Sequence, residues 1–108
     1  MKPRVFILEC NKDADYYAPA EVHGDLLFIV GRVDRRPSIW SSDLDELILK
    51  YLEENDFNPA RDHIGCVGNI VTTIRMTALV ISKYDKASFL LFDSKMKAYR
   101  ATTLPTAL

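Results

Sequence analysis

Two glycine-containing segments hold the residues whose types and spacing could bind an anion. Gly68-Asn69 follows a short apolar run, His63 to Val67, and precedes a long apolar segment of helical length. Gly31-Arg32 ends another apolar run, Leu26 to Val30. Free N–H groups at a helix start can hold an anion, and ligands of α/β proteins bind beyond the carboxyl ends of parallel strands. We therefore predict a small-ligand or nucleotide (anion) site built from Gly31, Arg32, Gly68, Asn69 and Arg75.

The glycine motif is also compatible with a purely structural turn. Each junction has one glycine, and neither GxGxxG nor GxxxxGK[ST] occurs. Asn69 could cap a helix and satisfy backbone donors without binding a ligand. Arg75 could line a groove, pair with an acid such as Asp62 or Asp93, or extend its charged head to water.

Basic residues gather in two further groups that could contact nucleic acid. The first is Arg32, Arg35 and Arg36, and the second is Lys95, Lys97 and Arg100. Aromatic residues near basic ones can stack on single-stranded bases. Asp34 offsets the first group and Asp93 the second, and the net charge is −1, which argues against a bulk electrostatic grip on nucleic acid. Nucleic-acid binding therefore ranks third, and it requires both groups to share one face.

Catalytic and metal-binding constellations are not evident. Neither His23 nor His63 has a second histidine or cysteine at ligand spacing, so we predict no metal site and no cofactor. An Asp62–His63 pair would need a nucleophile brought in by folding, such as Ser41, Thr72 or Thr73. We assign no catalytic residue, and a non-enzymatic role is favoured.

Length and composition are those of one ordinary soluble domain. The chain has 108 residues, of which 48% are hydrophobic and 27% are charged. Cys10 and Cys66 lie in apolar runs, where we expect buried, reduced thiols. The apolar run at the N-terminus is too short for a signal peptide, and the longest apolar stretch is too short to span a bilayer. We expect a cytoplasmic protein without membrane contact.

These candidate sites must be positioned by a mixed sheet with helical crossovers. Strands are predicted at 4–10, 26–30, 63–67, 89–92 and 98–103, with helices at 42–54 and 70–82 and a loop at 11–24. The uninterrupted apolar run 26–30 predicts a central strand. Ser42 and Asp45 match a capping box at the start of the first helix. The second helix is apolar on most sides, so we expect it to be the more buried of the two. The fold class is therefore α/β or α+β: a mixed sheet of about five strands with a central β-α-β-α-β run, two helices and a C-terminal β-hairpin.

Several segments together resemble one group of proteins. They are Lys-x-Arg-Val-Phe at 2–6, Pro-Ala-Glu-x-His-Gly-Asp-Leu at 19–26, Asp-Phe-Asn-Pro-x-x-Asp at 56–62, Val-Gly-Asn at 67–69 and Phe-Leu-Leu-Phe-Asp at 89–93. The chain resembles short, uncharacterised proteins encoded by tailed bacteriophages. It departs from their pattern at Asn58 and at Asn69-Ile70, where Asp and Asp-Pro are usual. The resemblance implies a phage accessory protein in the host cytoplasm, and it implies no catalytic residue.

The predicted function is that of a small non-enzymatic binding protein, acting through contact with a host or phage protein or through self-association. The small-ligand alternative would be favoured by a deep pocket at Gly68-Asn69 on which Arg32 and Arg75 converge. A flat rim and an exposed apolar patch would favour protein binding.

Overall fold

Five strands, three α-helices and one 3-10 helix organise the part of the chain that the structure describes. The computed structural model describes residues 2–9, 14–30 and 37–106. In chain order the elements are β1 (Arg4–Glu9), α1 (Ala14–Tyr17), the 3-10 helix η1 (Ala18–His23), β2 (Asp25–Val30), α2 (Ser42–Glu54), β3 (His63–Gly65), α3 (Ile70–Tyr84), β4 (Ala87–Asp93) and β5 (Ala98–Leu104). The strands form one sheet in the order β2-β1-β3-β4-β5, with β1 to β4 parallel and β5 antiparallel to β4. The predicted mixed sheet, β-α-β-α-β run and hairpin are confirmed.

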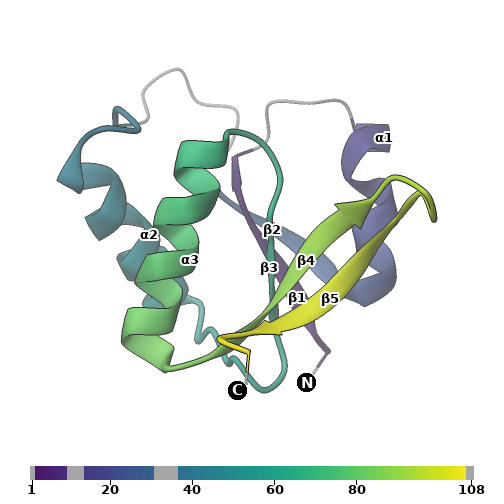
Figure 1. The fold of residues 1–108 in the computed structure, drawn as a ribbon. Coiled ribbons are helices and arrows are strands. Elements are labelled where there is room, and N and C mark those ends of the chain that lie inside the picture. Colours follow the sequence, from purple (N-terminus) through teal and green to yellow (C-terminus); the bar gives the residue numbers. More distant parts are fainter. Residues whose placement is uncertain (1, 10–13, 31–36, 107–108) are drawn as a thin grey trace.

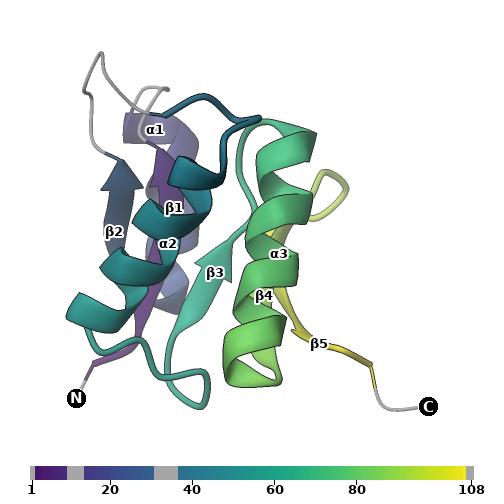
Figure 2. The ribbon, with the colours of Figure 1, turned by 90° about the vertical axis from the view of Figure 1, so that its left-hand side faces the viewer.

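Helices cover both faces of this sheet. α2 and α3 lie together on one face, and α1 with η1 lies on the other (Figures 1 and 2). The larger core lies under α2 and α3, where Phe6, Ile64 and Phe89 pack against Leu44, Ile48 and Val80. A smaller core lies under α1 and η1. The radius of gyration is 13.1 Å, close to the value of about 13 Å expected for a compact chain of this length.

The central strand is β1, whereas β2 lies at an edge of the sheet. Phe6 of β1 pairs with Leu27 on one side and Ile64 on the other, and its side chain is fully buried. The prediction that the apolar run 26–30 is a central strand is therefore wrong. The run is apolar because its side chains contact the cores on the two faces, and that burial does not require a second neighbouring strand.

The two long helices begin at residues that cap their first turns. Ser41, rather than the predicted Ser42, accepts a hydrogen bond from the Asp43 N–H, so the helix begins one residue after its cap. Asn69 caps α3 as predicted, accepting from the Val71 N–H at 2.7 Å. α2 and α3 lie side by side in one layer (Figure 2), and each buries three residues. The apolar character of α3 on most of its sides includes outward residues that stay exposed, such as Ile70 and Ile74.

The segment predicted as a loop at 11–24 contains α1 and η1. Pro19 lies in the first turn of η1, where its missing N–H costs nothing. Gly24 ends the segment at φ 155°, and a Cβ there would lie 2.4 Å from the Pro3 carbonyl oxygen. A residue without a side chain is needed at this close approach, which seats η1 against the start of β1.

The connections place a topological switch between β1 and β3. The chain leaves β1 through α1 and η1 on one face, and leaves β3 through α3 on the other face. Neighbouring parallel strands whose crossovers diverge leave a crevice at their carboxyl ends, where ligands of such sheets bind. The predicted Gly68-Asn69 site therefore lies at this switch.

Candidate functional site

The Gly68-Asn69 rim is exposed and is built as a helix cap. Gly68 has φ 106°, a conformation that favours glycine, and a Cβ there would meet open space. The Asn69 side chain caps the helix, and the Thr72 hydroxyl donates to the Asn69 carbonyl oxygen at 2.8 Å. The Val71 N–H and the Asn69 carbonyl oxygen thus have hydrogen-bond partners within the turn itself.

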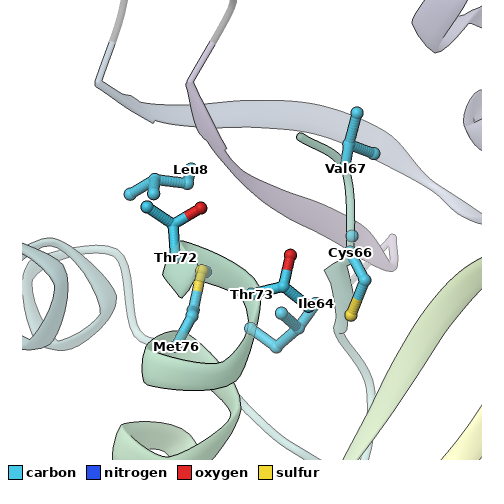
Figure 3. A pocket seen from close by; sticks show the side chains of 8 residues that line it. Leu8, Ile64, Cys66, Val67, Thr72, Thr73 and Met76 are labelled. Carbon is cyan, nitrogen blue, oxygen red and sulfur yellow. The ribbon is translucent and has the colours of Figure 1, made fainter. Parts of the chain in front are cut away.

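The cavity beneath this rim is small. It is lined by Leu8, Ile64, Gly65, Cys66, Val67, Thr72, Thr73 and Met76. Figure 3 shows the side chains of Thr72 and Met76 reaching into it from α3, while Cys66 and Val67 point to opposite sides of their segment. Its volume is about 10 Å³, which is room for about one water molecule. No deep pocket lies under the predicted anion site in the described part of the chain.

Arg75 binds the segment that precedes α2 instead of the rim. Its Nε lies 3.0 Å from the Asp45 carboxylate, and its Nη1 donates to the carbonyl oxygens of Ile39 and Ser41. The acid partner is therefore Asp45, not the predicted Asp62 or Asp93. Since the Arg75 side chain is only 25% exposed, the contact ties α3 to the start of α2 and leaves little of the guanidinium for a ligand.

Four predicted site residues, Gly31, Arg32, Arg35 and Arg36, lie outside the described residues, as does Cys10.

The described basic residues of the third prediction lie on the β4–β5 hairpin. Lys95 and Lys97 are exposed at the turn, and Arg100 on β5 pairs with Asp93 at 3.1 Å. Hydrogen bonds from the Met96 N–H and from Arg100 hold the pKa of Asp93 below its usual value. Asp93 neutralises part of the positive charge of this group, and whether Arg35 and Arg36 share its face stays a prediction.

A buried carboxylate at the start of β3 forms the densest polar cluster among the described residues. Asp62 is 1% exposed. It accepts from the Arg61 guanidinium at 2.9 Å, from the Arg4 guanidinium at 3.1 Å and from the N–H groups of Arg4 and Asn58. Burial alone would raise the pKa of Asp62, but these hydrogen bonds outweigh it and hold the pKa at about 2. All contacts of the carboxylate are internal, which indicates a structural role.

The two histidines meet on the η1 face of the sheet. The rings of His23 and His63 lie 5.7 Å apart, His23 Nε2 is 2.8 Å from the Tyr99 carbonyl oxygen, and His63 Nδ1 is 2.7 Å from Ser88 Oγ. Burial, followed by the proximity of His23, lowers the pKa of His63. The sequence gives no sign of this pair, because η1 and β3 are brought together only by the fold.

Cys66 carries a free thiol at the cavity wall. Burial raises its pKa to about 11. A thiol of that pKa carries almost no thiolate at neutral pH, so Cys66 is a packing residue rather than a nucleophile.

Large exposed apolar side chains are the surface feature that sequence reasoning missed. Trp40, Ile70 and Ile74 are 74%, 72% and 63% exposed. Ile70 and Ile74 lie one turn apart on α3, and Trp40 and Ile74 line one hollow of about 420 Å³ together with Arg75 and Asp45. We call Trp40, Ile70 and Ile74 the α3 patch. Its signal in the sequence is the apolar character of α3 on most of its sides, which we read as burial.

The fold and these surfaces define an α/β protein with a two-sided helical cover and an open apolar helix face. Within the described ranges, no group of three or more His, Cys, Asp or Glu side chains could hold a metal ion. None of the helices described has the length and apolar character needed to cross a membrane. No protein-family model, curated protein or solved structure that was compared with the chain matches it.

Proposed function

We propose that this chain is a non-enzymatic binding protein that acts by docking another protein on the α3 patch. The observation that carries the proposal is the exposure of Ile70 and Ile74 on α3 and of Trp40, which precedes α2 and lines one hollow with Ile74. Three large apolar side chains that are each more than half exposed form an apolar patch, and the largest such patches on monomeric proteins are often functional. Water contact with this area is unfavourable, and a partner that covers it would gain that free energy.

The surroundings of the patch also suit a protein interface. Protein interfaces have an apolar centre, often with tryptophan, and a polar rim. Here Trp40 and Ile74 supply the centre, and the Asp45–Arg75 pair supplies the rim. Arg75 Nε lies 3.0 Å from the Asp45 carboxylate. The pair holds both side chains in place, so a partner that docks there would cost little side-chain entropy.

The other two functions have weaker support from the described residues. A small-ligand site at Gly68 and Asn69 would require a larger pocket than the cavity of about 10 Å³ found there. Nucleic-acid binding would require Lys95, Lys97 and Arg100 to act with arginines outside the described residues. Both stay predictions. The resemblance to phage proteins supports a partner in the cytoplasm of a bacterial host, and this origin is part of the proposal.

The test compares two double variants with the wild-type chain by native mass spectrometry after recovery from the lysate of its own host. Trp40→Gln with Ile74→Gln removes the patch, and Val22→Gln with Met96→Gln is the matched control, since Val22 and Met96 are 86% and 70% exposed elsewhere. We expect a stoichiometric protein partner on wild type and on the control, and its loss from the patch variant. Retention by the patch variant, a homodimer alone, or a bare monomer throughout would contradict the proposal.

A further inference from the structure

A second concave surface lies on the opposite side of the sheet from the α3 patch. It is a cleft of about 300 Å³ between α1, η1 and the β4–β5 hairpin, lined by Asp15, Tyr16, Pro19, Phe92 and Tyr99. α1 lies on the face of the sheet away from α2 and α3 (Figure 1). Because the cleft shares no residue with the α3 patch, its function is a separate question from the proposed one.

Three aromatic rings form the apolar walls of the cleft. Tyr16 and Phe92 are 49% and 51% exposed, whereas Tyr99 is 5% exposed. The ring of Phe92 packs edge-on against Tyr99 with centroids 5.3 Å apart, and Tyr16 packs edge-on against Tyr17 at 5.5 Å. These edge contacts fix the orientation of the rings. The aromatic wall of the cleft is therefore built from rings that each pack against a neighbouring ring.

Among the described residues that line the cleft, Asp15 is the one with a charged side chain, so the lining itself carries a negative charge. The nearest ion pair of the hairpin, Asp93–Arg100, belongs to residues that alternate with Phe92 and Tyr99, so its side chains point to the other face of the hairpin. An apolar occupant would strip water from the Asp15 carboxylate without replacing its hydrogen bonds. A cation would satisfy the carboxylate and would also be attracted by the negative faces of the rings.

We propose that the cleft of Asp15, Tyr16, Pro19, Phe92 and Tyr99 binds the side chain of an arginine carried by a partner protein. A guanidinium is planar, stacks on aromatic faces and is more weakly hydrated than an ammonium, so it fits this site better than lysine does. Its fork of N–H donors can engage both oxygens of a carboxylate such as Asp15. The volume of about 300 Å³ suits one long side chain and lies at the lower limit for small-molecule pockets.

The probe is N-acetyl-Gly-Arg-Gly-amide, titrated into the full chain labelled with nitrogen-15 and followed by NMR. The matched control peptide carries citrulline, which keeps the shape of arginine and removes its charge. We expect shifts at Asp15, Tyr16 and Phe92 with a dissociation constant of about 1 mM. The citrulline and lysine peptides should bind at least about tenfold and about threefold more weakly.

Variants of the chain complete the test. Asp15→Asn should weaken binding of the arginine peptide by about fivefold to tenfold, and Phe92→Leu by a similar factor. Asp25→Asn, at an exposed carboxylate on β2, should leave binding unchanged, as should the Trp40→Gln, Ile74→Gln variant of the α3 patch. If Phe92→Leu fails to fold, Asp15→Asn at the exposed Asp15 still decides. Equal binding of the citrulline or lysine peptide, unchanged affinity in Asp15→Asn, or shifts confined to residues outside the cleft would overturn the proposal.

Discussion

Replacement of Asp62 by asparagine should remove a large part of the stability of this fold. The carboxylate is 1% exposed and joins β3 to the start of β1 through the guanidinium and the backbone N–H of Arg4. Its pKa falls from 3.8 to about 2. At 1.36 kcal/mol for each pH unit, that difference corresponds to about 2.5 kcal/mol of stability at pH 7.

The mutational cost should be of similar size. Removing one partner of a buried ion pair costs about 3–5 kcal/mol when the other charge is left uncompensated. Here Arg4 and Arg61 are 14% and 20% exposed, so they can regain some water, and the asparagine oxygen keeps one acceptor. We expect Asp62→Asn to lower the free energy of unfolding by about 2–4 kcal/mol at pH 7, measured by urea denaturation followed by circular dichroism.

The pH dependence supplies a sharper test. Because the pKa of Asp62 is lower in the folded state than in the unfolded one, its contribution is complete above about pH 4 and is lost as the pH falls through about 2. The contribution of Asp62 to the free energy of unfolding should be about 1.3 kcal/mol at pH 3. The difference in the free energy of unfolding between wild type and Asp62→Asn should therefore be smaller at pH 3 than at pH 7. Asp25→Asn, at an exposed pair with Lys2, should change stability by less than about 0.5 kcal/mol. A loss below about 0.5 kcal/mol in Asp62→Asn, or a gap of equal size at both pH values, would refute the reasoning.

Three further predictions concern single residues. Burial lowers the pKa of His63 below its ordinary 6.5. The free energy of unfolding should therefore be greatest above that pH and should decline as the pH falls through it. His63→Gln should weaken this pH dependence, measured by urea denaturation. An unchanged profile would show that another group titrates. Gly24→Ala would place a Cβ 2.4 Å from the Pro3 carbonyl oxygen and should cost about 1–3 kcal/mol in the same assay; a change near zero would mean that the backbone yields there. With a pKa of about 11, Cys66 should react with a disulfide reagent at pH 7 about 100-fold more slowly than an unhindered thiol, tested in a variant lacking the other cysteine. A rate near that of a free thiol would place Cys66 in an open, polar site.

The elements of this fold were largely predictable because their signals are local. The helix at 42–54 has an apolar stripe at Leu44, Ile48 and Leu52, and these three side chains are buried. Asn69 could be recognised as a cap from its place after Gly68, since a cap needs only backbone groups two or three residues away. The short helices at 14–23 escaped recognition, because a few turns around Pro19 leave no measurable periodicity.

The residues of the candidate sites were harder to predict because their partners are distant in the sequence. Arg75 meets Asp45 thirty positions earlier, and Asp62 meets Arg4 on another strand. A charge pattern in one segment does not say which element packs beside it. The exposure of Trp40 and Ile74 could not be predicted either, because the type of an apolar residue does not show whether neighbouring elements cover it.

The class of fold, the cap at Asn69 and the closing hairpin follow from the residues alone, since each depends on periodicity and turn chemistry within a few residues. The central place of β1, the edge place of β2, the enclosure of Asp62 by two arginines and the exposure of Ile70 and Ile74 depend on the folded chain. Burial and pairing are properties of neighbours in space. They depend on which faces of the sheet the crossovers cover, and that choice is made by the packing of the whole chain.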